Sequence, residues 1–142
     1  MAKYTEIEGK CRKIVEDARN GVFAPVYLLM GGEPYYPDVV CDAIMKYALQ
    51  DDERDFNQAV YYGLDTDADA VASEARSYPM MAERRLVVLK EAQSMKTLEG
   101  LGVYAAEPMD TTVLVILMHG ASADKRKALY KNLSKKGIVL ES

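Results

Sequence analysis

Residues 26–44 of the chain read VYLLMGGEPYYPDVVCDAI and decide the fold class. The first five of these residues are all apolar, and Gly31-Gly32 ends the run, which is typical of a buried β-strand. Pro37 then opens a segment with Val40, Ala43, Ile44 and Tyr47 at helical spacing, and proline suits the first turn of a helix. A buried strand followed directly by a helix is the unit from which parallel sheets are built.

The same alternation continues along the chain in both directions. We expect strands at 55–61, 86–89, 112–118 and 138–140. We expect a helix at 4–18, one capped within Asp65-Thr66-Asp67, one capped by Ser94, and one capped by Ser122 that ends at Lys135-Lys136-Gly137. This pattern predicts an α/β protein, a three-layer α/β/α sandwich around a five-stranded, mostly parallel sheet.

Length and composition indicate an ordinary globular domain. The 142 residues correspond to one domain, and 49% of them are hydrophobic. The net charge of −4 argues against a protein whose main task is to coat nucleic acid, because that task requires neutralising phosphates.

The cysteines and the lengths of the apolar runs indicate the compartment in which the protein acts. Cys11 and Cys41 are far apart and form no CxxC pair, which argues against a disulfide framework and a thiolate zinc site. The N-terminal residues carry no signal-peptide pattern. The longest apolar run, 113–118, has six residues, whereas a membrane span needs about twenty. We therefore expect a cytoplasmic protein with no membrane contact.

Gly31-Gly32 lies where a phosphate-binding loop would lie, but the required pattern is missing. Counting GxxxxGK[ST] from Gly31 places Tyr36, Pro37 and Asp38 at the glycine, lysine and hydroxyl positions, and counting from Gly32 fails as well. The strand at 86–89 is followed by Lys90-Glu91 instead of an aspartate that would position magnesium. We expect no cofactor, although the sequence leaves residual ligand binding at Gly31-Gly32 open.

Two further patterns give even less support for a metal site or a catalytic site. The carboxylates of 65–69 imitate the start of a calcium loop, but Ala70 and Arg76 stand where glycine and glutamate are needed, so a helix cap is favoured. His119 has no serine or cysteine partner in a recognisable motif, so we expect a satisfied or solvated histidine. No catalytic or metal-ligating residue is predicted.

Six basic residues gather near the C-terminal end: Lys125, Arg126, Lys127, Lys131, Lys135 and Lys136. They form either a solvated face that complements the negative end of the last helix or a contact for an acidic partner or a DNA backbone. The sequence leaves both readings open.

The most unusual stretch is 77–85, which reads SYPMMAERR. Pro79 breaks the preceding helix, and Tyr78, Met80 and Met81 are apolar residues in the turn before the next strand. Either these side chains pack in the core, or they form an exposed plug that enters a pocket on a partner.

Three stretches, 26–35, 82–92 and 124–131, together resemble the N-terminal domain of the delta subunit of bacterial DNA polymerase III. The resemblance covers essentially the whole chain and is closest to delta subunits of the Bacteroides type. It implies a degenerate P-loop NTPase fold of the AAA+/RecA-like type, with strand order 5-1-4-3-2 and without ATP binding or catalysis by this chain. The family's role is to bind and open the ring-shaped sliding clamp during DNA replication.

In this family two adjacent apolar side chains before the third strand enter a pocket on the clamp. By position they are Met80 and Met81, preceded by Tyr78 and Pro79, where other members have a leucine-phenylalanine pair. The resemblance also implies that 1–142 is a single N-terminal domain, followed in the family by lid and collar domains. Those missing C-terminal domains carry most contacts to the delta prime and gamma/tau subunits, and DNA is a partner of the full loader.

Two other functions remain alternatives from the residues alone. A P-loop ATPase with a divergent site would bind ATP and magnesium. A stand-alone small-ligand module would have an occupied pocket at the carboxyl ends of the strands.

Overall fold

A parallel sheet forms the centre of the molecule in the computed structural model, which describes the backbone of residues 2–142 and the side chains of residues 5–142. Its strands are β1 (Val26–Met30), β2 (Gln58–Tyr62), β3 (Arg85–Lys90), β4 (Thr112–Leu117) and β5 (Ile138–Glu141). They lie side by side in the order β2-β3-β4-β1-β5, and every neighbouring pair is parallel. The predicted architecture and strand order are confirmed.

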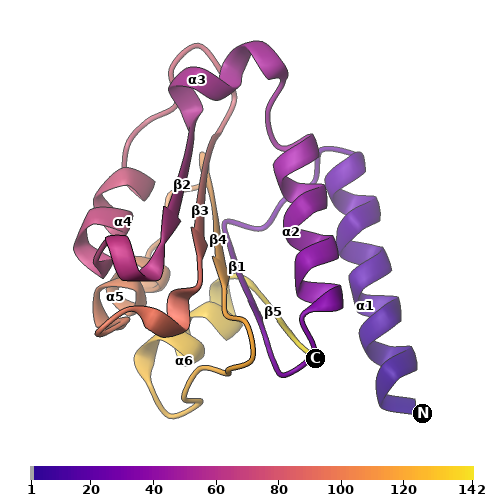
Figure 1. Ribbon diagram of the computed structural model, residues 1–142. Helices are drawn as coiled ribbons and strands as arrows, with labels where there is room; N and C mark the ends of the chain where they lie inside the picture. Colours follow the sequence, from indigo (N-terminus) through magenta and orange to yellow (C-terminus); the bar gives the residue numbers. More distant parts are fainter. Residues whose placement is uncertain (1) are drawn as a thin grey trace.

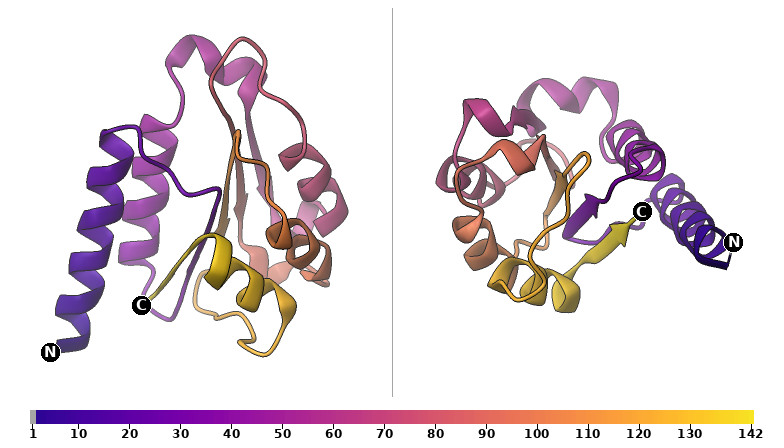
Figure 2. Two further views of the ribbon diagram at one scale, coloured as in Figure 1. Left: turned by 180° about the vertical axis from the view of Figure 1, so that it is seen from behind. Right: turned by 60° about the horizontal axis from the view of Figure 1, so that its bottom comes forward.

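Helices cover both faces of the sheet (Figures 1 and 2). On one face lie α1 (Ala2–Arg19) and α2 (Tyr35–Tyr47), and on the other α4 (Ala68–Ala75), α5 (Glu99–Ala106) and α6 (Ala128–Lys136). Side chains alternate between two apolar clusters along each central strand, so that Leu28 and Met30 face α4–α6 while Tyr27 and Leu29 face α1 and α2. This two-sided burial explains why these strands are apolar throughout.

The stretch predicted as a strand from 55 to 61 is wrong in its first half. Residues 51–53 form a 3-10 turn, η1, and Arg54–Asn57 form the short helix α3, so β2 begins only at Gln58. Glu53 Oε1 accepts a hydrogen bond from the Gln50 N–H at 2.8 Å, which caps the turn. The Arg54 guanidinium donates to the carbonyls of Met45 at 2.6 Å and Lys46 at 3.2 Å, which ties α3 to the end of α2.

One predicted cap is confirmed and two are wrong. Asp67 caps α4 by accepting the N–H of Ala70 at 2.8 Å. Ser94 lies in the turn η3 (Ala92–Ser94), and α5 begins later, at Glu99, whose N–H donates to the Thr97 hydroxyl. Ser122 donates instead to the Glu141 carboxylate at 2.6 Å, so α6 begins only at Ala128.

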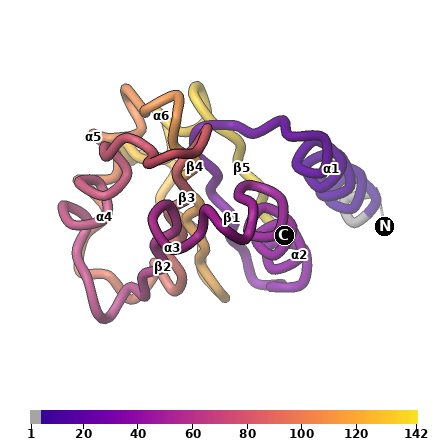
Figure 3. The backbone as a smooth tube through the Cα atoms, turned by 90° about the horizontal axis from the view of Figure 1, so that it is seen from above, coloured from indigo at the N-terminus to yellow at the C-terminus, as the bar shows by residue number. Residues whose placement is uncertain are grey.

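The two edges of the sheet differ in what they carry. Because the strands are parallel, all their carboxyl ends meet at one edge, at the bottom of Figure 1. The amino ends meet at the other edge, where α3 and the 76–84 segment cross the top of the molecule, as Figure 3 shows from above. None of the helices in the described range, 2–142, is both long and apolar enough to cross a membrane.

Candidate functional site

At the carboxyl edge, two backbone N–H groups of the loop after β1 are engaged within the protein. The Gly31 N–H donates to the Ala121 carbonyl at 2.9 Å, and the Glu33 N–H donates to the Ser142 carbonyl at 3.4 Å. Gly31 has φ +121°, and a Cβ there would lie 1.9 Å from the Ser142 carbonyl oxygen, so only glycine is tolerated. A bound phosphate needs such N–H groups free and pointing at it, and these two are already engaged.

The N-terminus of α2 is also occupied by carboxylates of the chain itself. Glu33 Oε1 accepts the Tyr35 N–H at 3.1 Å, and Asp38 lies in the first turn of the helix. The positive end of the helix dipole therefore already holds negative charge where a nucleotide phosphate would otherwise bind.

His119 joins three segments at this edge. Its Nε2 lies 2.6 Å from Asp38 Oδ1, and its Nδ1 lies 3.0 Å from Glu91 Oε1. Hydrogen bonds to Asp38 and Glu91 raise the pKa of His119, and the hydrogen bond from His119 lowers the pKa of Glu91. The expectation of a satisfied histidine is confirmed, but the two partners were not foreseen, because they lie far from His119 in the sequence.

No metal centre is formed by the side chains of residues 5–142. No group of three or more His, Cys, Asp or Glu side chains there is arranged to hold an ion. Both cysteines are buried and free, and burial raises the pKa of Cys41 to about 11, which keeps its thiol protonated and unreactive.

A pocket of about 750 Å³ opens on the α5–α6 face of the carboxyl edge. Apolar side chains form much of its wall, and charged side chains of both signs also line it. The lining residues include Met95, Leu98, Met118, Leu129, Lys96, Lys127, Glu99 and Asp124. This pocket is the place where a small-ligand module would bind its ligand.

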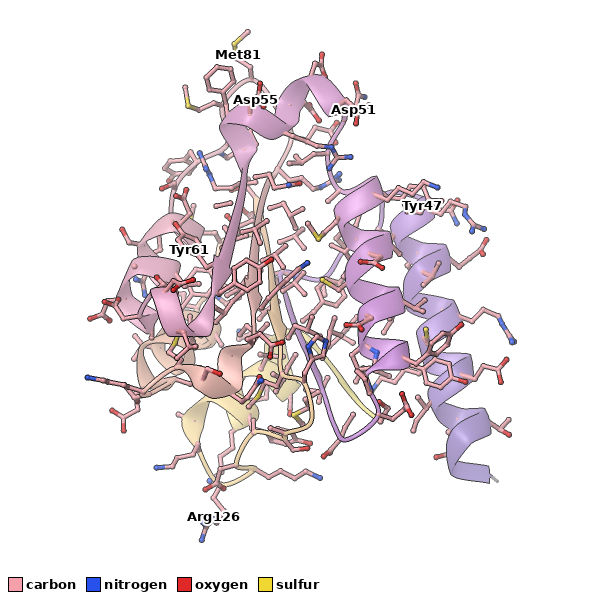
Figure 4. The ribbon with its side chains drawn as sticks, viewed as in Figure 1. Tyr47, Asp51, Asp55, Tyr61, Met81 and Arg126 are labelled. Atoms are coloured by element: carbon pink, nitrogen blue, oxygen red, sulfur yellow. The ribbon has the colours of Figure 1, made fainter. Side chains whose placement is uncertain are left out.

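The opposite, amino edge carries the predicted plug. Tyr78, Met80 and Met81 are 74%, 56% and 101% exposed, while Pro79 is half-buried. Figure 4 shows Met81 pointing away from the fold at the very top of the molecule. These side chains are exposed, so the core-packing alternative is wrong.

Buried Asn57 fixes the backbone beneath these exposed side chains. Asn57, at the end of α3, is 1% exposed. Its Oδ1 accepts the Met80 N–H at 2.7 Å, and its Nδ2 donates to the Met80 carbonyl at 2.9 Å. One side chain thus takes the place of a pair of backbone hydrogen bonds and anchors the loop at Met80.

Arg85 fixes the other side of the loop. It is 8% exposed; its Nη1 pairs with Glu74 Oε2 at 2.8 Å and its Nη2 donates to the Tyr78 carbonyl at 3.1 Å. Met81 itself has φ 56°, the left-handed region that a non-glycine residue rarely adopts. Apolar side chains are therefore presented to solvent on a hydrogen-bonded and locally strained backbone.

The sequence reasoning missed the supporting residues and one exposed aromatic. Asn57 and Phe56 were assigned to a strand, whereas α3 turns Asn57 inward and leaves Phe56 66% exposed. We call Phe56, Tyr78, Met80 and Met81 the apolar crest. The capping pair Gln50 and Glu53, three residues apart, was the one local signal that could have indicated a helical turn here.

Hydrogen exchange tests whether Asn57 holds the loop. The Met80 amide should exchange about tenfold more slowly than those of Met81 and Glu83, because a buried hydrogen bond must break first. In Asn57→Ala this protection should be lost, whereas Asn57→Asp, which keeps the oxygen acceptor, should retain part of it. Equal exchange at Met80 in the natural and Asn57→Ala proteins would show that Asn57 does not fix the loop.

The six basic residues lie apart from the apolar crest. All six are exposed, and Lys125, Arg126 and Lys127 precede α6, because Asp124 accepts the Arg126 N–H and forms a turn there. Lys125 pairs with Glu141 at 3.3 Å and Arg126 with Asp124 at 3.1 Å. Figure 4 places Arg126 at the bottom of the molecule, at the opposite end from Met81.

Comparisons with known proteins identify similar chains. The family model described as DNA polymerase III, delta subunit, matches residues 27–142. The DNA polymerase III subunit delta of Bacillus subtilis (strain 168) is 30% identical over an alignment of 134 positions, which covers 87% of this chain and 39% of that protein. The solved structure of the Bacillus subtilis DNA clamp loader delta protein YqeN has a TM-score of 0.82 at 27% identity, over 93% of this chain and 42% of that one.

More distant structures share the fold alone. A RuvB variant from Thermotoga maritima has a TM-score of 0.53 at 16% identity, over 97% of this chain and 45% of that one. This likeness agrees with the predicted AAA+-like fold class. The chain spans about two-fifths of the length of the Bacillus subtilis relatives.

Proposed function

Because this chain belongs to the DNA polymerase III delta subunit family, we propose that it is the clamp-binding domain of a clamp-loader subunit. The observation that carries the proposal is the pair Met80 and Met81, exposed on a loop whose backbone is held by Asn57 and Arg85. The resemblance to the family points to the same two positions as the clamp contact. Tyr78 and Pro79 belong to the same contact.

The physical basis of this contact is burial of apolar surface on a preformed loop. Each methionine that passes from water into a pocket contributes roughly 1.5–3 kcal/mol. A loop that is already ordered loses little conformational entropy on binding, so more of that energy appears as affinity. Methionine is flexible and polarisable, which lets the pair adapt to a pocket that accepts leucine and phenylalanine in other members.

We further propose that residues 1–142 form the first domain of a longer delta subunit. The relatives' greater length leaves room for the lid and collar domains of the family. Contacts with the delta prime and gamma/tau subunits, and with DNA in the assembled loader, are proposed to depend on those domains. The proposed place of action is the cytoplasm, and the chain itself catalyses no reaction.

Calorimetry with ATP and magnesium tests the proposed loss of nucleotide binding. We expect no heat of binding up to millimolar nucleotide. The N–H groups of Gly31 and Glu33 already donate to carbonyls of the protein, and the Asp38 carboxylate is hydrogen-bonded to His119. The P-loop lysine and the magnesium ligands, which supply several charge-assisted contacts in active ATPases, are missing. A micromolar dissociation constant would instead support the ATPase alternative.

The proposed function is tested by capturing the sliding clamp from the same source on the immobilised chain. We expect the clamp to be retained by the natural chain and lost from a Met80→Ala/Met81→Ala variant. Failure of the folded natural chain to retain the clamp would count against the proposal.

A further inference from the structure

We propose that α3 forms a second part of the same interface, in which Phe56 enters an apolar recess of the clamp that has a basic rim. This inference rests on the proposed function and extends it to a residue outside the 77–81 stretch. Phe56 is a large aromatic side chain, 66% exposed, on a helix of only four residues. Phe56 precedes Asn57, whose side chain binds the Met80 backbone, so an exposed aromatic side chain and two exposed methionines lie at the same edge of the sheet. Exposed apolar side chains gathered in one region are typical of a binding site.

The position of Phe56 relative to the methionines is fixed by its neighbour. Asn57 binds both the N–H and the carbonyl of Met80. Phe56 directly precedes Asn57 in the chain, so it is close to the residue that holds Met80 in place. Successive side chains in a helix diverge by about 100°, so inward Asn57 leaves Phe56 facing out at the same edge. Figure 4 shows that the preceding residue, Asp55, lies at the top of the molecule, as Met81 does.

The helix that carries Phe56 is itself held firmly. Arg54 donates to two carbonyls at the end of α2, and its side chain is only 26% exposed. The Asn57 Nδ2 also donates to the Glu53 carbonyl at 3.0 Å. Phe56 is therefore presented on an ordered backbone, as the methionines are, and its burial in a partner would require little reordering.

Charge near Phe56 defines the chemistry of the partner. Asp51, Asp52 and Asp55 are all exposed on η1 and α3, and Asp51 and Asp55 lie at the top of the molecule in Figure 4. Carboxylates at the border of an apolar anchor favour a partner surface with lysine or arginine around its recess. Such pairs at the rim raise the association rate more than they raise the affinity.

The first test compares two exposed apolar residues. Phe56→Ala should weaken clamp binding about tenfold in surface plasmon resonance with the immobilised clamp, without a change in melting temperature. The matched control is Leu64→Ala, because Leu64 is 82% exposed but follows β2 at the carboxyl edge. This control should bind like the natural chain.

The second test concerns the acidic border. Asp52→Asn/Asp55→Asn should slow association severalfold at low ionic strength, and the difference should vanish at high salt, with dissociation unchanged. Association of the Asp52→Asn/Asp55→Asn variant as fast as that of the natural chain would overturn the basic-rim part of the proposal.

The results separate this inference from the proposed function. If Phe56→Ala binds like the natural chain while Met80→Ala/Met81→Ala does not, α3 is not part of the interface and the proposed function stands. If the natural chain does not bind the clamp, the proposed function itself fails. If Leu64→Ala weakens binding as much as Phe56→Ala, the contact lies elsewhere and the inference is wrong.

Discussion

Replacing both Met80 and Met81 by alanine is expected to weaken binding to the sliding clamp roughly 100-fold or more. Two methionines that become buried contribute about 1.5–3 kcal/mol each, and every ~1.4 kcal/mol changes the dissociation constant tenfold. Binding energy of this kind concentrates in a few anchors, so the rest of the surface should not compensate. The measurement is the dissociation constant of each variant for the clamp by surface plasmon resonance.

Thermal unfolding of the same variant provides the control. The melting temperature should change little, because both side chains are exposed in the free domain. A double variant with matched loss of exposed apolar surface, Leu64→Ala/Val103→Ala, should retain full clamp affinity, since these residues are 82% and 68% exposed but lie on η2 and α5. A melting temperature lowered by many degrees with unchanged affinity per folded molecule would contradict the account.

Replacing Arg85 by leucine is expected to lower the free energy of unfolding by about 2–3 kcal/mol. Breaking a buried ion pair costs about 3–5 kcal/mol, and the loss is smaller here because the Glu74 side chain is 29% exposed. The Tyr78 carbonyl also loses its donor. At this chain length, the melting temperature should fall by roughly 8 °C.

An exposed ion pair supplies the comparison for Arg85. Arg12→Leu removes a pair with Glu8 whose side chains are 72% and 54% exposed, so it should leave the melting temperature nearly unchanged. Because Arg85 also holds the base of the loop, Arg85→Leu should weaken clamp binding although Met80 and Met81 are intact. Unchanged melting temperature in Arg85→Leu would show that the pair does not stabilise the domain.

Most of the fold could be predicted because the sheet is buried on both faces. Continuous apolar runs such as 26–30 and 112–117 can be strands of a covered parallel sheet, and they became β1 and β4. The prediction failed where packing and backbone contacts decide the conformation. The polar stretch that became α3 is stabilised by hydrogen bonds from Arg54 to carbonyls of α2. Ser122 donates a hydrogen bond to Glu141 instead of capping a helix.

The candidate site was predictable only in its exposed part. Met80 and Met81 could be predicted as candidate contact residues because they are adjacent apolar residues that follow a proline in a turn. Asn57 supports Met80 across 23 residues, and His119 meets Asp38 across 81, so no local spacing could reveal either contact. These residues are brought together by the order of the strands, which the sequence pattern alone did not determine.

Methyl NMR on the chain labelled at its eight methionines tests most directly whether the apolar crest binds the clamp. Addition of unlabelled clamp should shift or broaden the Met80 and Met81 methyl signals. The signals of buried Met30 and of pocket-lining Met95 and Met118 should keep their positions. Changes confined to Met95 and Met118, or no change at any methionine at saturating clamp, would contradict the account.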